Sequence, residues 1–231
     1  MYIYGKNVAL EALKKKERVK KVYLNQNFHD EELLFLIEQN HLSTKIVDKN
    51  MLDRMVGGNH QGIILEVPDY EYAELEDLFT TENPLLVILD HLEDPHNFGA
   101  IIRTCEAAGV DGIIIPKDRS VEVNGTVSRV SVGAISSMKI ARVTNLVRTL
   151  DELKKNGFWI VGTDMNGTDY DKIDYRGKIA IIIGNEGSGM SRLVEENCDF
   201  IASIPMKGKI NSLNASVAAG IVIFEAVKNR R

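Results

Sequence analysis

Between residues 84 and 231 the hydrophobic positions gather into short continuous runs, and turn-forming residues lie on either side of each run. Such runs are typical of strands that are buried on both faces of a mainly parallel sheet. Helical periodicity follows each of them. Alternation of strands and helices predicts a doubly wound α/β domain. The predicted strands are Leu85–Leu89, Gly112–Ile115, Phe158–Val161 and Ile179–Ile183, and the predicted helices are Phe98–Ala108, Leu146–Lys155, Ser191–Asn197 and Leu213–Lys228.

Residues 1–67 show shorter patterns that predict a separate small α/β unit. Asn7 is expected to cap a first helix, and Asp30 to begin a second one with Leu33, Leu34, Leu36 and Ile37 facing inward. The remaining expected elements are strands at Val19–Leu24, Ser43–Val47 and Gly62–Val67 and a helix at Asn50–Val56.

Charge separates these two parts of the chain. Residues 67–83 contain six acidic residues and no basic one, and Pro68 and Pro84 flank most of this stretch. We therefore expect a flexible linker at 68–83, between an N-terminal domain (1–67) and a C-terminal domain (84–231). The basic run Lys14, Lys15 and Lys16 is a candidate RNA contact, although such a run is also compatible with a solvated helix face.

Composition narrows the class of protein. The chain has 231 residues, a formal net charge of −5, 44% hydrophobic and 26% charged residues, which excludes a disordered chain or a disulfide scaffold. Two cysteines, no secretory leader and no long apolar run indicate a cytoplasmic protein that is not bound to a membrane. The five histidines lack metal-ligand spacing, so we expect no metal site.

The first candidate loop follows the Leu85–Leu89 strand and spans residues 94–103. Asn97 is expected to cap the next helix, and Arg103 lies about one turn into it. A guanidinium there suits a phosphate or carboxylate. An equally open alternative is a structural arginine paired with Glu106 or Asp90.

Two further loops follow later strands. Residues 184–190 contain three glycines, which allow the backbone to approach a ligand, although a plain glycine-rich connection remains an alternative. This loop matches neither the nucleoside-triphosphate nor the dinucleotide fingerprint, and a dehydrogenase is therefore disfavoured. In the stretch 204–220, Ser212 is expected to cap the last helix, whose small residues permit close packing.

Taken together and in this order, the three loops resemble the motifs of the SpoU (TrmH) family of RNA ribose 2′-O-methyltransferases, in the SPOUT superfamily. The N-terminal segments 4–13 and 60–63 also resemble that family's substrate-binding domain. The matching motifs are Asn97-x-Gly99-x-x-x-Arg103, Ile183-Gly184-Asn185-Glu186-Gly187-x-Gly189, and Pro205-Met206-x-Gly208 continuing through Ser212-Leu213-Asn214-x-Ser216-x-Ala218.

The resemblance implies an α/β fold with a deep trefoil knot, S-adenosylmethionine as cofactor, and a homodimer whose active site is completed by the partner subunit. It implies that the cofactor is bound by Thr163, Gly184, Ile204, Met206 and Leu213. Arg103 would act at the ribose hydroxyl and its phosphate, and Asn97 would position Arg103 or the ribose. Hydrogen bonds from Glu186, Ser212 and Asn214 would order the pocket.

Within the family, the two-domain layout is most similar to bacterial enzymes that methylate a guanosine ribose in 23S rRNA. Three alternatives remain: a tRNA ribose methyltransferase, an rRNA methyltransferase that confers antibiotic resistance, and a non-catalytic RNA-binding factor for ribosome assembly. Cofactor binding would distinguish the last alternative from the enzymes.

Overall fold

The computed structural model describes residues 1–209 and 212–230, and its contacts divide the chain into two compact units. The first unit comprises Met1–Glu71 and Glu122–Ser136, and the second comprises Tyr72–Val121 and the chain from Ser137 onward. The segment Glu122–Ser136 belongs to the first unit by its contacts, although it lies far beyond the expected boundary in sequence.

The first unit is built on a four-stranded sheet in the order β1-β4-β2-β3. β1 and β2 pair antiparallel with β4, whereas β2 and β3 are parallel. Ile63 and Leu65 of β4 are fully buried in its core. The elements of this unit are β1 (Tyr2–Tyr4), α1 (Lys6–Lys14), β2 (Lys21–Asn25), α2 (Glu31–Gln39), β3 (Thr44–Val47), α3 (Lys49–Val56), β4 (Ile63–Glu66) and α5 (Gly125–Ser131).

The second unit contains a six-stranded sheet in the order β10-β8-β9-β5-β6-β7, and every pairing in it is parallel. All residues of β5, β6 and β9 are buried, as the continuous apolar runs predict. Its elements are β5 (Leu85–Leu89), α4 (Pro95–Ala108), β6 (Gly112–Pro116), β7 (Ile140–Val143), α6 (Leu146–Lys155), β8 (Trp159–Asp169), β9 (Ile179–Ile183), α7 (Arg192–Glu195), β10 (Phe200–Ser203) and α8 (Ala215–Asn229).

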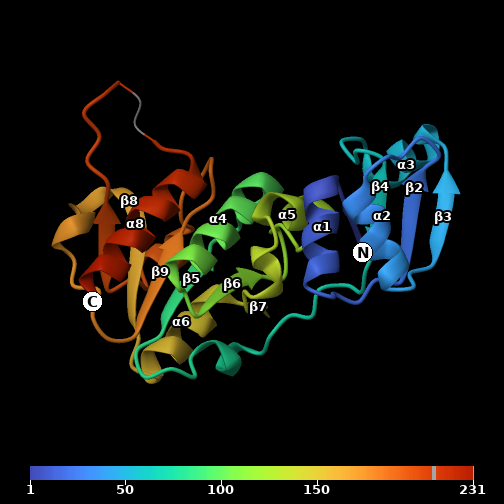
Figure 1. Ribbon diagram of the computed structural model, residues 1–231. Helices are drawn as coiled ribbons and strands as arrows, with labels where there is room; N and C mark the ends of the chain where they lie inside the picture. Colours follow the sequence, from blue (N-terminus) through green and yellow to red (C-terminus); the bar gives the residue numbers. More distant parts are fainter. Residues whose placement is uncertain (210–211, 231) are drawn as a thin grey trace. The chain divides into compact units, whose positions relative to one another are not determined.

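The strand order reverses direction between β5 and β9. From β5 the chain moves outward through β6 and β7, and it then crosses to β8 on the other side and returns to insert β9 next to β5. Ligands of doubly wound sheets bind where the order reverses, at the carboxyl ends of the strands. Helices α4 and α8 pack against each other near this point (Figure 1). The α/β class with a parallel sheet is confirmed, and the deep trefoil knot stays a prediction.

Three predicted helix caps and one predicted inward position are wrong. Gly5 stands at the N-cap of α1 in place of Asn7, because the helix begins at Lys6, two residues earlier than a cap at Asn7 implies. In α2 the side chain of Asp30 caps the helix as predicted, but Leu34 is 39% exposed, whereas Leu33 and Ile37 are buried in the core and Leu36 packs against it. The other two wrong caps are those of α4 and α8.

Part of the acidic stretch 68–83 is packed rather than free. Ala73 pairs with Ala141, and Leu78 is 1% exposed in the core of the second unit. Leu75 and Phe79 pack against the same core. The apolar side chains at these positions hold the stretch in place, so the charge pattern alone overstates its freedom.

Candidate functional site

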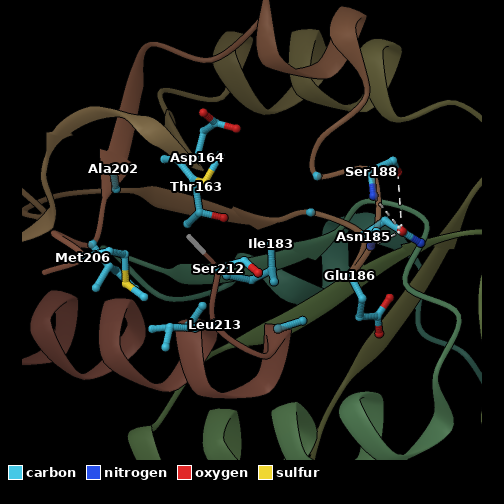
Figure 2. A pocket seen from close by; sticks show the side chains of 17 residues that line it. Thr163, Asp164, Ile183, Asn185, Glu186, Ser188, Ala202, Met206, Ser212 and Leu213 are labelled. Carbon is cyan, nitrogen blue, oxygen red and sulfur yellow. Dashed lines mark hydrogen bonds between the residues drawn. The ribbon is translucent and has the colours of Figure 1, made fainter. Parts of the chain in front are cut away.

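A cavity of about 340 Å³ opens at the carboxyl ends of β8, β9 and β10, within the second unit (Figure 2). All five residues predicted to bind the cofactor line it, together with the predicted Glu186 and Ser212. Its lining consists of Thr163, Asp164, Met165, residues 183–189, Ala202, Ile204, Met206, Ser212, Leu213, Ala215 and Ala218. The structure thus brings the second and third sequence loops together around one space.

The charge of this cavity restricts what it can bind. Asp164 and Glu186 contribute carboxylates, whereas no lysine, arginine or histidine is among the described lining residues. These carboxylates would repel the phosphate of a phosphate-bearing ligand, and no cation in the described lining would compensate. They would not repel a cationic or neutral ligand. Apolar side chains such as Ile204 and Leu213 complete a surface that suits a planar ring.

The loop after β9 leaves no space for a side chain at its first position. A Cβ placed on Gly184 would lie 2.5 Å from the carbonyl carbon of Gly189 and 2.6 Å from the amide nitrogen of Met190. The backbones of Asn185 and Gly189 exchange hydrogen bonds of 2.9 and 3.0 Å, which fold the loop back on itself. The side-chain oxygen of Asn185 also accepts from the amide of Gly187, at 2.9 Å. The loop is therefore a tight, internally bonded turn.

A buried carboxylate fastens this loop at its far end. Asp90, which is 1% exposed, accepts a 2.6 Å hydrogen bond from the backbone amide of Ser191. Its other oxygen lies 2.6 Å from Nδ1 of His91. The side chain of Asn185 donates to the carbonyl oxygen of His91, at 2.7 Å. The sequence predicts Asp90 only as a possible partner for Arg103 and not in this role, although a polar residue directly after a buried strand is a usable signal.

Three predicted site residues form a continuous chain of hydrogen bonds. The side-chain nitrogen of Asn214 donates to the side-chain oxygen of Asn97, at 2.9 Å. Asn97 in turn donates from its side-chain nitrogen to Oε1 of Glu186, at 2.9 Å. Asn97 is buried, so both ends of its amide are used within the protein. The relay joins the start of α8 to α4 and to the loop after β9.

The helix caps at this site differ from the predicted ones. Asp94, not Asn97, caps α4, because the helix begins at Pro95. The backbone amide of His96 donates a hydrogen bond to the side chain of Asp94. Asn214, not Ser212, caps α8 by accepting from the amides of Ser216 and Val217. Ser212 instead lines the cavity. Asn97 is therefore free to join the relay rather than to close its own helix.

Arg103 lies outside this cavity. Its side chain is exposed, and among residues 1–209 and 212–230 it has no hydrogen-bond or ion-pair partner. The predicted alternative of a structural arginine paired with Glu106 or Asp90 is therefore not observed. Arg103 lies six positions after Asn97 on α4, so their side chains point about 120° apart around the helix axis. Asn97 contacts Asn214 and Glu186 and does not position Arg103 directly.

The basic run of the first unit is partly neutralised. Lys14 Nζ lies 2.7 Å from a Glu32 carboxylate oxygen, and Lys15 Nζ lies 3.4 Å from one of Glu11. Lys16 is exposed at the end of the helix. All three lysines are on the surface, but two of them already have acidic partners.

The described residues contain no group of three or more His, Cys, Asp and Glu side chains arranged to hold a metal ion. None of the helices they form is long and apolar enough to cross a membrane. Cys105 and Cys198 are both free thiols, and burial raises the pKa of Cys198 to about 12.

Comparison with known proteins identifies both parts of the chain. Residues 84–224 match the SpoU rRNA Methylase family, and residues 2–73 match the family described as RNA 2′-O ribose methyltransferase substrate binding. This chain belongs to the SpoU (TrmH) family of RNA methyltransferases. A Bacillus subtilis protein, YacO, whose name places it among TrmH family tRNA/rRNA methyltransferases, is 44% identical over 99% of this chain and 96% of its own.

Solved structures of SpoU proteins share the fold. The SpoU methyltransferase AviRb from Streptomyces viridochromogenes, in complex with AdoMet, is 25% identical and aligns with a TM-score of 0.81 over 99% of this chain and 89% of its own. The AdoMet-bound rRNA methyltransferase from Sinorhizobium meliloti is 27% identical, with a TM-score of 0.79 over 98% and 86%. The A. aeolicus TrmH/SpoU tRNA modifying enzyme is 34% identical, with a TM-score of 0.58, and covers 67% of this chain and 79% of its own.

Proposed function

We propose that this SpoU-family protein uses S-adenosylmethionine to methylate the ribose 2′-hydroxyl of a guanosine in 23S rRNA. The observation that carries the proposal is the cavity at the ends of β8, β9 and β10, which has two carboxylates and no basic side chain among its described lining residues. A sulfonium is cationic and carries no phosphate, so it matches this lining, whereas NAD or ATP does not. The AdoMet bound to AviRb supports the same choice of cofactor.

The residues present fit that cofactor. Thr163 donates its hydroxyl to the carbonyl oxygen of Ile182, at 2.8 Å, and so fixes one wall of the cavity. The tight turn at Gly184 presents backbone groups, and Ile204, Met206 and Leu213 supply an apolar surface for an adenine ring. When bound, S-adenosylmethionine would supply an electrophilic methyl group.

The reaction requires the ribose hydroxyl to lose its proton, because a neutral hydroxyl is a poor nucleophile. We assign Arg103 to hold the neighbouring phosphate and to stabilise the developing alkoxide. The guanidinium of an arginine stays charged in proteins, so it is poorly suited to remove the proton itself. The neighbouring phosphate is a candidate acceptor for that proton.

The position of Arg103 supports a homodimer with a composite site. The side chain is exposed and does not line the cavity of its own chain. In a homodimer, Arg103 of one protomer would act on cofactor held by its partner.

The proposal also includes the deep trefoil knot in the second unit and a location in the cytoplasm.

The share of this chain that aligns with each solved structure favours rRNA over tRNA as the substrate. The S. meliloti rRNA methyltransferase aligns over 98% of this chain, including the first unit, whereas the A. aeolicus tRNA modifying enzyme covers 67%. Residues 1–67 would then form the RNA substrate-binding domain and residues 84–231 the methyltransferase domain. Because the A. aeolicus enzyme is 34% identical over the shared part, a tRNA ribose substrate is the second candidate.

The test is transfer of labelled methyl groups to total RNA from a strain that lacks this gene. The RNA is separated by size and digested, and the labelled nucleoside is identified. We expect label in 2′-O-methylguanosine from large rRNA. Label in tRNA would support the second candidate, and absence of both transfer and cofactor binding would favour a non-catalytic RNA-binding factor.

Arg103→Ala is run in parallel with Arg148→Ala, which removes an exposed arginine of α6 in the same unit. We expect Arg103→Ala to abolish transfer while cofactor binding, measured by calorimetry, persists. Because the Arg103 side chain has no partner in the described structure, its loss should change the free energy of unfolding by less than about 0.5 kcal/mol. Equal loss of transfer and cofactor binding in a folded dimer would contradict the assigned role.

A further inference from the structure

A second cavity, of about 580 Å³, lies within the first unit and is not explained by methyl transfer. It opens between the segment after β2 and the loop that connects α3 to β4. Its lining is rich in amides and includes two lysines, two histidines and one phenylalanine. The residues are Lys6, Asn25, Asn27, Phe28, His29, Lys49, Asp53, Gly58, Asn59, His60, Gln61 and Gly62.

Part of this lining is a fixed frame. His60 is 6% exposed, its Nδ1 accepts from the amide of Gly62 at 2.9 Å, and its Nε2 lies 3.0 Å from Asp53. The amide of Lys6 donates to Oε1 of Gln61, at 2.8 Å. These bonds hold the loop between α3 and β4 against the start of α1.

The loop is also held in an unfavourable backbone conformation. Asn59 and Gln61 have φ angles of 57° and 51°, and Gly57, Gly58 and Gly62 have φ angles of 74°, 106° and 84°. Residues other than glycine rarely adopt a positive φ angle. They keep this conformation where the surrounding structure imposes it, often at binding sites. The frame therefore presents Asn59 to the cavity in a preset orientation.

Other lining groups are left free. The side chains of Asn27, His29, Lys49 and Asn59 are exposed and have no hydrogen-bond or ion-pair partner in the described part of the chain. The side-chain amides of Asn27 and Asn59 can each offer a hydrogen-bond donor and an acceptor to the edge of a base. An ammonium and an imidazole can contact a phosphate. Phe28 is half-buried and contributes an apolar wall, with Lys6 Nζ lying 5.3 Å from its ring centroid.

We propose that this cavity receives one unpaired nucleotide of the substrate RNA, an inference that rests on the proposed RNA methyltransferase function. Sequence-specific proteins read RNA through bases that are splayed out of the helix, because the major groove of paired RNA is too narrow for side chains. Asn27 and Asn59 contact the edge of the base, and Lys49 and His29 contact its phosphate. The site is distinct from the Lys14–Lys16 run, where two ammonium groups already have acidic partners.

Binding of the full chain to fluorescein-labelled RNA hairpins tests this proposal. Four hairpins carry a single bulged A, C, G or U, and a fifth has the same stem fully paired. We expect at least one bulged hairpin to bind about fivefold or more tightly than the paired one. Asn27→Ala combined with Asn59→Gly should remove this preference. Glycine replaces Asn59 because it tolerates the positive φ there.

Lys49→Ala should weaken binding of the bulged hairpin and lower the slope of its salt dependence by about one. Matched controls are Gln39→Ala and Lys45→Ala, which remove an exposed amide and an exposed lysine outside the cavity. Equal binding of bulged and paired hairpins by the unmodified protein would overturn the proposal, as would equal effects of the cavity and control variants. Calorimetry with S-adenosylmethionine on the same samples separates this failure from failure of the proposed function.

Discussion

The side chains of Asn214 and Asn97 are 117 positions apart in the sequence and share a hydrogen bond of 2.9 Å. The direction of this bond is fixed from both sides. Asn214 uses its oxygen to cap α8, so its nitrogen must donate, and Asn97 uses its own nitrogen to reach Glu186. The start of α8 and the loop after β9 are thus connected through the buried amide of Asn97.

Breaking this relay should cost both stability and cofactor affinity. Asn97→Ala leaves Asn214 and Glu186 without their partner, at a cost of about 1–3 kcal/mol in the free energy of unfolding. Asn214→Ala should cost about 0.5–2 kcal/mol through loss of the cap alone, in addition to the relay. Chemical denaturation of both single variants and the double variant should give a coupling of at least about 0.5 kcal/mol. Asn166→Ala, on an exposed part of β8, is the control, and strictly additive effects would contradict the relay.

A methyl group at Gly184 should damage the cofactor site more than one at Gly187. The Cβ in Gly184→Ala meets backbone atoms at 2.5 and 2.6 Å, whereas the Cβ in Gly187→Ala meets only Oδ1 of Asn185, at 3.6 Å. Because backbone atoms cannot move aside as a flexible side chain can, the whole turn must shift. We expect Gly184→Ala to weaken S-adenosylmethionine binding about tenfold or more and to lower Tm. Gly187→Ala should keep Tm unchanged, and equal Tm values for the two variants would contradict this account.

Removal of the basic run should have a limited effect on RNA binding. Replacing Lys14, Lys15 and Lys16 with glutamine removes three charges, but Glu32 and Glu11 already compensate two of them. We expect weaker binding and a decrease of about one in the slope of log K against log salt. Anisotropy titrations at several salt concentrations measure both quantities. Unchanged binding would indicate that the run is only a solvated surface, and a decrease of about three would mean that the ion pairs open on binding.

The thiol of Cys198 should react slowly at neutral pH. Burial raises its pKa to about 12, although Lys154 nearby acts in the opposite direction. Because the thiolate is the reactive form, alkylation by iodoacetamide at pH 8 should be about a hundredfold slower than for a free cysteine. The rate should rise as pH increases toward 12. Cys198→Ser supplies the background from Cys105, whose burial also raises its pKa.

The raised pKa of Cys198 also predicts that the folded protein loses stability at alkaline pH. The unfolded thiol has a pKa of about 9, and the folded one about 12. As pH rises between these values, the unfolded state loses its proton first and is favoured. The contribution of Cys198 is therefore fully present below pH 9 and decreases above it. Cys198→Ser should flatten the stability curve over this interval, and an unchanged slope would contradict the shift.

The sequence was most informative where burial alone determines the structure. Strands such as β5 and β9 are covered on both faces, so every residue in them is apolar and the pattern is continuous. The short strand β10 (Phe200–Ser203) was missed because half of it is not buried. β7 was missed for a similar reason, since its Arg142 interrupts the apolar pattern. The segment α5 was missed because its seven residues include three hydroxyl-bearing side chains and a glycine.

The site was predictable only in part. Its loops could be found because they follow buried strands, and the resemblance to the SpoU family supplied the lining residues Thr163 and Leu213. The caps could not be assigned, because Asn97 and Asp94 are both good capping residues and only the exact start of α4 selects between them. Asp164, whose carboxylate helps to define the charge of the cavity, carried no signal in the sequence pattern.

The position of β9 between β5 and β8 has a consequence for synthesis of the chain on the ribosome. β5 is complete at Leu89, but the strand that covers its free edge ends at Ile183. Until that strand emerges, β5 presents unpaired backbone N–H and C=O groups along an edge of a strand whose side chains are all apolar, which is a surface prone to aggregation. The cavity residues lie between Thr163 and Ala218, so a cofactor bound there, as we propose, cannot stabilise the nascent chain until Ala218 has been synthesised. Early folding of the second unit must therefore proceed without help from its ligand.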